Sequence, residues 1–271
     1  MHELPELEIQ RAFLAEQFAG SRITQIEYKD KKVKNAHADS FEKDVVLTSL
    51  WFVERRGSNF LLHLDNGKRL CLSWTDAARM FVSNADGSKE KDKAAVTIYF
   101  GDTKLSLYGI EADDIELLTV REAEKKYANL GADPLDRHMS VQKFKERFAR
   151  KRSSLKSALT DEALLIGIGN VYSDEIAFQS ELSPAIKLSE LTEQDWEKLF
   201  AETKSVLKEA IQLGGISQNP LHEEDHFTGG YSSHLRVYGK EGENCGRCGA
   251  AVIKKVIGRK KSYLCSNCQK E

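Results

Sequence analysis

The sequence lacks any long uninterrupted run of apolar residues, although it has 271 residues in all. A helix that spans a bilayer needs about 20 consecutive apolar residues, so we do not expect a membrane protein. The first residues also lack the basic stretch followed by an apolar stretch that characterises a secretory leader. We therefore expect a cytoplasmic protein.

An excess of charge of one sign is also missing, because the formal net charge is only −2. The charges are nevertheless distributed unevenly along the chain. Residues 140–156 contain seven basic residues and one acidic residue, and residues 245–271 contain the same numbers. Two such segments in a near-neutral chain indicate a charged face for a polyanion. For either segment alone, a solvated helix face or a basic tail is the alternative.

Cysteine is scarce, with five in the chain, and four of them form two Cys-x-x-Cys pairs. Cys245 and Cys248 are separated from Cys265 and Cys268 by 16 residues. Four thiolates at this spacing satisfy one tetrahedral zinc ion, so we expect a single structural zinc. Disulfides are the competing interpretation, but they are uncommon in a reducing compartment. The fifth cysteine, Cys71, lies in an expected strand and is interpreted as a buried apolar residue.

The first half of the chain has the pattern of one helix followed by strands. A hydrophobic content of 41% and a charged content of 30% are typical of a globular protein, and the length suits two domains. Apolar spacing predicts a helix over residues 5–18. Short strands are expected at residues 23–28, 45–50, 60–64, 69–73, 95–100 and 104–108. Such a run predicts an antiparallel sandwich or barrel.

After about residue 119 the pattern becomes helical. Helices are expected at residues 121–130, 140–150, 171–180 and 192–213. Thr192 is the expected N-cap of the last helix, with Asp195 three residues further on. Residues 131–134 form the best hinge. Residues 214–232 form a loop whose length is typical of a functional or mobile segment.

Two local features favour contact with phosphates. Residues 252–256 and 262–264 are expected to form a hairpin held by the zinc, with Arg259, Lys260 and Lys261 at its tip. A zinc ribbon that serves only protein contacts is the alternative. Gly167-Ile168-Gly169-Asn170 precedes an expected helix, whose N-terminus can bind an anion. A tight turn between two helices explains that sequence equally well.

These pieces occur in an order that resembles the formamidopyrimidine-DNA glycosylase and endonuclease VIII family of base-excision repair enzymes. The resemblance is carried by Lys156 with residues 167–175, by residues 237–242 leading into Cys245, and by residues 3–6. It implies an N-terminal β-sandwich flanked by helices, a helix-two-turns-helix DNA-binding domain and a zinc-finger β-hairpin. The boundaries expected here are 1–130, 131–232 and 233–271.

The resemblance also implies a chemistry. Family members remove oxidised bases and cut at the abasic site, through an N-terminal amine that forms a Schiff base with the sugar. By position, Glu3 becomes the catalytic acid and His2 occupies the place of the nucleophile. A nucleotide turned out of the duplex must sit beside this amine and carboxylate. An α-amine is partly neutral near pH 7, unlike a typical lysine.

The resemblance further implies the DNA contacts and the partner. Asn170 and Lys260 would hold the phosphates that flank a lesion, with Arg259 beside them, and Lys156 would support that surface. The expected partner is double-stranded or damaged DNA. We expect a monomer that associates with the nucleoid when it is bound to DNA, and no membrane partner.

Several positions depart from the family pattern. His2 stands where the family usually has proline, and Met1 is normally removed only before a small residue, so which α-amine comes first stays open. Ser58 replaces a DNA-contacting lysine, and residues 109–114 carry acids in place of Asp-Pro-Arg-Arg-Phe. Trp74 is interpreted as a core residue rather than as a wedge between bases.

The departures leave three functions open. The first is a DNA glycosylase with AP lyase activity that uses the terminal amine and Glu3. The second is a DNA-binding paralogue without chemistry, acting as a lesion or structure sensor, which the changes at His2 and Ser58 favour. The third is a zinc-ribbon protein that binds protein partners.

Overall fold

The computed structural model describes residues 2–29, 32–33, 36–86 and 93–269. The chain divides into two compact units, each made of separate segments. The sheet unit comprises Met1–His2, Glu6–Asn129 and Ile216–Gly229. The helical unit comprises Glu3–Pro5, Leu130–Gly215 and Gly230–Glu271. The linear division at residues 130 and 232 stays a prediction.

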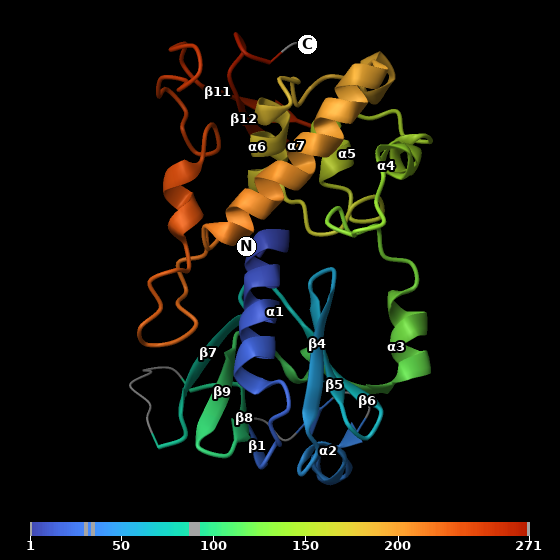
Figure 1. Ribbon diagram of the computed structural model, residues 1–271, viewed down its shortest axis with the longest axis vertical. Helices are drawn as coiled ribbons and strands as arrows, with labels where there is room; N and C mark the ends of the chain where they lie inside the picture. The colour runs from blue at the N-terminus through green and yellow to red at the C-terminus, as the bar shows by residue number, and fades with distance from the viewer. Residues whose placement is uncertain (1, 30–31, 34–35, 87–92, 270–271) are drawn as a thin grey trace. The chain divides into compact units, whose positions relative to one another are not determined.

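The sheet unit contains two four-stranded antiparallel sheets, drawn in Figure 1 with the helices that accompany them. The first sheet has the order β1 (Gln25–Tyr28), β8 (Val96–Phe100), β9 (Thr103–Tyr108), β7 (Arg79–Asn84). The second has the order β10 (Ile115–Thr119), β6 (Lys68–Ser73), β5 (Asn59–Leu64), β4 (Leu50–Arg56). The remaining elements are α1 (Leu4–Phe18), α2 (Ala38–Val45), α3 (Val120–Tyr127), η1 (Ala112–Asp114) and the short pair β2 (Lys32–Val33) and β3 (Ala36–His37).

Apolar side chains of the strands and of α1 build the core of the sheet unit. Phe60, Leu62 and Leu64 of β5 are buried, and Phe18 of α1 stacks on Phe100 of β8 with ring centroids 4.2 Å apart. Each fully buried side chain of this kind contributes about 1.5–3 kcal/mol. The predicted sandwich is therefore confirmed.

Two single-residue interpretations in this unit also hold. Trp74 is 5% exposed and its ring lies 5.0 Å from that of Phe60, so it is a core residue and not an exposed wedge. Cys71 is buried within β6.

The strand predicted over residues 45–50 is wrong. Val45 is the last residue of α2, and β4 begins only at Leu50. Between them the chain turns through Leu47, whose φ of +68° lies in the left-handed region. A short apolar run does not distinguish a helix end from a strand. Here the run over residues 45–50 begins at the end of α2 and finishes at the start of β4. Several elements were not predicted from the sequence: strands β2, β3, β7 and β10 and helices α2 and α5.

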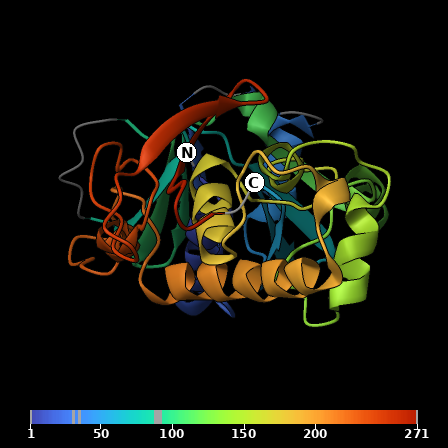
Figure 2. The same ribbon diagram turned by 90° about the horizontal axis from the view of Figure 1, so that it is seen from above.

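The helical unit consists of short helices, one long helix and one hairpin. Its elements are α4 (Val141–Phe148), α5 (Leu155–Leu159), α6 (Asn170–Gln179), η2 (Leu188–Glu190), α7 (Glu193–Gln212), η3 (Gly230–His234), β11 (Ile253–Ile257) and β12 (Lys260–Leu264). Figure 2 shows α6, in yellow, between α7 and the β11–β12 hairpin. The predicted cap is present, because Thr192 accepts from the backbone N–H of Asp195 at 3.2 Å and Asp195 accepts in return.

Helix α6 forms the centre of the helical unit and is buried on nearly every side. Its buried residues include the polar Ser173, Asp174 and Glu175, each with no exposed area. Buried carboxylates need compensating donors, and these three side chains organise the site described below. Within the described ranges, no helix has the length and apolarity needed to cross a bilayer.

Candidate nucleic-acid interface and metal centre

Glu3 lies in the helical unit, where its carboxylate binds the N-terminus of α6. The side chain is 2% exposed and accepts from the backbone N–H groups of Gly169, Val171 and Tyr172 at 2.8, 2.9 and 3.2 Å. The first N–H groups of a helix have no partner within the helix, and its dipole favours negative charge there. These N–H groups therefore hold the carboxylate in a fixed position, and the helix dipole stabilises its negative charge.

Gly169 makes this contact sterically possible. A Cβ on Gly169 would lie 2.5 Å from Oε1 of Glu3, which is closer than real atoms approach. The sequence left open whether these backbone groups bind an anion such as phosphate or only form a tight turn. In the structure the anion that they bind is Glu3 of the same chain.

Asn170 is the first residue of α6 and is half-buried. Its backbone carbonyl accepts from Nζ of Lys156 at 2.8 Å. Its side-chain amide makes no hydrogen bond to any residue that the structure describes. The amide is therefore available to donate to an external acceptor such as a phosphate oxygen.

Lys156 lies beneath this helix start and is fully buried. Its Nζ donates to the carbonyl of Asn170, to Oγ of Ser173 and to Oδ1 of Asp174, at 2.8, 2.8 and 2.7 Å. Burial lowers the pKa of Lys156, and the charge of Asp174 opposes that shift. These bonds use all three ammonium protons, so Lys156 holds the first turns of α6 in place.

Two adjacent acids of α6, Asp174 and Glu175, attach the cysteine-bearing segment to the helices. Asp174 accepts from Oγ of Ser262 and from the backbone N–H of Tyr263 in β12, the latter at 2.8 Å. Glu175 accepts from three consecutive backbone N–H groups, each at 2.9 Å, those of Arg236, Val237 and Tyr238. The chain is thus held both before and after the first cysteine pair. Sequence reasoning missed this role, although two acids inside an otherwise apolar helix were a signal that could have revealed it.

The hairpin tip is a two-residue turn made by Gly258 and Arg259, with φ of +55° and +68°. Two successive left-handed residues form the turn that suits a twisted hairpin, and Arg259 adopts it at a cost of about 1–2 kcal/mol. The Arg259 side chain is exposed and has no ion pair within the described ranges. Lys260 is half-buried, and its Nζ donates to Oγ1 of Thr160 at 2.5 Å.

Four cysteine sulfurs gather at the base of the same hairpin. The Sγ atoms of Cys245, Cys248, Cys265 and Cys268 all lie within 4.8 Å of one another. Cys245 and Cys268 are 3.9 Å apart, and Cys248 and Cys265 are 3.4 Å apart. A tetrahedral ion with metal–sulfur bonds of about 2.3 Å places its sulfurs about 3.8 Å apart. The four residues can therefore hold one metal ion.

His2 lies in the sheet unit, and Met1 lies outside the described residues. The Nε2 of His2 is 2.7 Å from the carbonyl oxygen of Ala78, and its ring meets Trp74 edge to face. Because a carbonyl only accepts, Nε2 carries the proton. The Nδ1 atom is buried and has no partner among the described residues. Burial lowers the pKa of His2, partly offset by the bond to Ala78.

The basic segment of residues 140–156 is partly neutralised inside the helical unit. Lys145 pairs with Glu193, and Lys151 pairs with Asp161 at 2.7 Å. Lys156 is buried, as described above. Arg150 and Arg152 are exposed. The segment therefore presents less free charge than its composition indicates.

Ser58 and the acidic segment 109–114 are parts of the sheet unit. The carbonyl of Ser58 accepts from the backbone N–H of Trp74 at 2.8 Å. Asp114 turns back on its own loop, where it accepts from the backbone N–H of Glu111 at 2.8 Å. This acid is thus engaged within its own segment.

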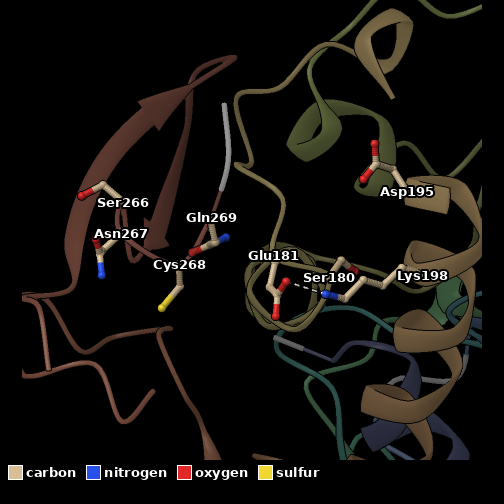
Figure 3. Close-up of a pocket in the computed structure, with 8 residues that line it drawn as sticks. All are labelled: Ser180, Glu181, Asp195, Lys198, Ser266, Asn267, Cys268 and Gln269. Carbon is tan, nitrogen blue, oxygen red and sulfur yellow. Dashed lines mark ion pairs between the residues drawn. The ribbon is translucent and has the colours of Figure 1, made fainter. Parts of the chain in front are cut away.

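A polar cavity of about 280 Å³ lies beside the second cysteine pair, and Figure 3 shows its lining. Lys198 of α7 and Glu181 form an ion pair of 2.7 Å across it. Of the predicted site residues it includes only Cys268. The lining therefore includes neither the predicted DNA contacts nor Glu3.

A two-sheet unit, a helical unit and a four-cysteine hairpin define a class of modular nucleic-acid-binding protein. Models of two domains match this chain: the formamidopyrimidine-DNA glycosylase N-terminal domain over residues 1–109 and the formamidopyrimidine-DNA glycosylase H2TH domain over residues 130–220. The chain therefore belongs to the formamidopyrimidine-DNA glycosylase family, as the resemblance predicted.

Individual relatives match over their whole length. The formamidopyrimidine-DNA glycosylase of Listeria monocytogenes is 30% identical over 281 residues, and that of Carboxydothermus hydrogenoformans is 28% identical over 271, with all of each chain covered. Among solved structures, the Lactococcus lactis Fpg in complex with abasic-site DNA has a TM-score of 0.88 and 25% identity, covering 99% of this chain and 100% of its own. The same protein with DNA that contains Fapy-dG has a TM-score of 0.85, 25% identity and the same coverage.

Proposed function

We propose that the chain is a DNA glycosylase of base-excision repair that binds damaged DNA and also cuts at the abasic site. The observation that carries this proposal is the carboxylate of Glu3, which three backbone N–H groups of α6 hold in place next to residue 2. A fixed carboxylate directly following an amine is the pair that imine chemistry on a sugar requires. The relatives named above carry the same enzyme name along their whole length.

The proposed chemistry begins when Met1 is removed and the α-amine of His2 becomes free. The amine attacks C1′ of the sugar, and the bond to the damaged base breaks with its electron pair leaving on the base. Glu3 holds and returns protons at the sugar oxygen as the ring opens to a protonated imine. Loss of a proton from C2′ then expels the 3′ phosphate and cuts the strand.

The DNA contacts of this proposal are Asn170, Arg259 and Lys260, with Lys156 as their support. The free amide of Asn170 and the exposed guanidinium of Arg259 suit phosphate oxygens. Lys260 keeps a positive charge near them while it is tied to Thr160. The proposed metal is a single structural zinc held by four thiolates. We also propose that the chain is a monomer in the cytoplasm and that it associates with the nucleoid when it is bound to DNA.

Trapping with borohydride tests the enzymatic proposal. Duplex DNA with one abasic site or one oxidised base is incubated with the full chain, whose first residue is established by intact mass. We expect a covalent protein–DNA adduct, and we expect Glu3→Gln to lower its yield at least about tenfold. Absence of an adduct with every lesion tested would contradict the proposal.

A DNA-binding protein without chemistry is the second candidate. The observation that favours it is again Glu3, since a carboxylate that accepts three backbone N–H groups already has a structural role. This candidate predicts salt-sensitive binding to damaged duplex with no strand cleavage. Turnover that is lost in Glu3→Gln while binding persists would exclude it.

A further inference from the structure

The sheet unit holds the neutral imidazole of His2 in one tautomer. Its Nε2 donates to the carbonyl of Ala78 at 2.7 Å, which leaves a lone pair on Nδ1. That Nδ1 is buried, and it has no partner among the residues described. A buried acceptor without a donor destabilises the folded protein, and a proton accepted during the reaction would satisfy it.

The position of Nδ1 relative to the chain follows from covalent structure. Four bonds separate it from the backbone nitrogen of the same residue, through Cα, Cβ and Cγ. A proton passing between the two nitrogens therefore closes a six-membered ring. Once residue 2 is the first residue, this nitrogen is the attacking amine.

We propose that Nδ1 of His2 relays a proton from the α-amine of His2 to the sugar oxygen during attack on an abasic site. The inference rests on the proposed function, since it assumes that this amine is the nucleophile. It gives the histidine a task that the proline of the family pattern cannot perform, because proline has no side-chain base.

The step balances on the aldehyde form of the abasic sugar. The amine lone pair forms the N–C1′ bond, and the C=O electron pair moves onto oxygen. Nδ1 accepts one proton from the resulting ammonium and returns it to that oxygen, which gives a neutral carbinolamine. A second proton, taken from the medium, is then added to the carbinolamine hydroxyl, so that water leaves as the nitrogen lone pair forms the protonated imine. The imidazole ends as it began.

The surroundings keep the imidazole neutral at the pH where it must accept a proton. Burial lowers the pKa of His2, and the positive charge of the chain's N-terminus lowers it further. The hydrogen bond to Ala78 and the charge of Asp76 oppose that shift. Trp74 covers one side of the ring and carries no charge. The relay is therefore competent at pH 7 and fails only when the medium is acidic enough to protonate Nδ1.

The test compares four full-length proteins, each released from a cleavable leader so that residue 2 is first: the His2 protein, His2→Ala, His2→Phe and His2→Pro. His2→Phe keeps a ring against Trp74 without a base, and His2→Pro supplies the family amine. Intact mass verifies each terminus. The rate of adduct formation with abasic duplex and cyanoborohydride is measured from pH 5.5 to 9, with and without added imidazole.

At pH 7 we expect the His2 protein to react about 100-fold faster than His2→Ala and His2→Phe. Added imidazole should raise the rate of His2→Ala in proportion to its concentration, and the gap should narrow toward pH 9. Equal rates for the His2 protein and His2→Ala at all pH values would overturn the relay while leaving the amine chemistry intact. Failure of every protein to form an adduct would overturn both, and a fast His2→Phe would assign the ring a packing role only.

Discussion

Glu3 is bound by backbone groups that lie 166 or more positions away in the chain. Replacing Gly169 with Ala tests whether that binding matters, because the added Cβ would lie 2.5 Å from Oε1 of Glu3. The φ of Gly169 is −105°, outside the left-handed region that favours glycine, so the close contact with Glu3 is the main consequence of the substitution. We expect the carboxylate to be displaced.

For Gly169→Ala we expect a fall of at least about tenfold in adduct formation with abasic DNA and a loss of about 1–3 kcal/mol in stability. Adduct yield and thermal unfolding are the measurements. Gly246→Ala is the matched control, because a Cβ added there would have nothing within 4 Å. A Gly169→Ala protein that reacts like the wild type would show that the position of the carboxylate is not critical.

Arg259 combines an exposed charge with a strained backbone. Its φ of +68° suits glycine, so Arg259→Gly removes the charge and relieves the strain together. We expect stability to stay level or rise by up to about 1 kcal/mol. We expect DNA affinity to fall and the slope of log K against log salt to decrease by about 1.

Titrations of labelled duplex at several salt concentrations measure that slope. Lys208→Ala removes an exposed charge from α7 and serves as the control. If Arg259→Gly binds DNA with an unchanged salt slope, Arg259 makes no phosphate contact.

Residue types were easier to predict than their partners. The sequence correctly indicated that an anion belongs at the start of α6, because glycines before a helix leave its N–H groups open. It could not indicate that the anion is Glu3, since only the tertiary fold brings residues 3 and 169 together. Lys156 shows the same limit, because its neighbours in sequence gave no sign that it is buried against Asp174.

At the scale of elements, the loop Ile216–Gly229 is organised by one carboxylate. Asp225 accepts from the backbone N–H groups of Leu221, Phe227 and Thr228 and from Oγ1 of Thr228. Burial alone would raise the pKa of Asp225, but these hydrogen bonds outweigh it and the net shift is downward. The loop thus gains stability from the ionised form.

The sign of the pH dependence follows from that shift. A lowered pKa in the folded loop contributes stability that is present above the ordinary value of 3.8 and is lost as the pH falls through the folded value. We expect Asp225→Asn to speed hydrogen exchange at Phe227 and Thr228 about tenfold at neutral pH. The difference from the wild type should shrink progressively as the pH falls below 3.8 and the wild-type carboxylate becomes protonated.

Exchange measured by mass spectrometry on peptides of this loop provides the readout. Glu224→Gln is the control, since this neighbouring acid is exposed. Equal protection in Asp225→Asn and the wild type at neutral pH would show that the loop is ordered by other contacts.

Elements with local signals were predicted closely, and elements without them were not. The predicted bounds of helices α6 and α7 were correct to within one residue. Gly169 marks the start of α6, and Thr192 marks the start of α7. The region of α2 and β4 was misassigned, since its apolar residues fit either element and the deciding turn at Leu47 has no glycine. A left-handed leucine is stabilised by the surrounding structure and leaves no trace in the sequence.

At the scale of the whole molecule, each unit is assembled from separate segments of the chain. Glu3–Pro5 belongs to the helical unit although Glu6–Asn129 belongs to the sheet unit. Composition shifts along the chain cannot reveal such an exchange, because they assign neighbours in sequence to the same unit. The boundary between the units therefore cannot be predicted from composition alone.

The hairpin that carries the four cysteines has little core of its own, so its dependence on a metal can be tested. Its buried cluster contains Phe178, Val237, Cys245, Val252 and Cys265, so two of its five members are proposed metal ligands. A core of that size does not fold alone and relies on the metal. We therefore expect Cys265→Ser, or removal of the metal by a chelator, to unfold the hairpin, while the sheet unit keeps its own thermal transition.

Metal content, calorimetry and DNA affinity together measure the outcome. We expect about one zinc per chain in the wild type and almost none in Cys265→Ser, with an affinity for damaged duplex that is at least tenfold weaker. Cys71→Ser is the matched control, because Cys71 is buried in the sheet unit and lies outside the metal cluster. It should lower the stability of the sheet unit and leave the zinc content unchanged. If Cys265→Ser retains both its zinc and its affinity, the four thiolates are not the structural support of the DNA-binding hairpin, and Asp174 and Glu175 must hold it unaided.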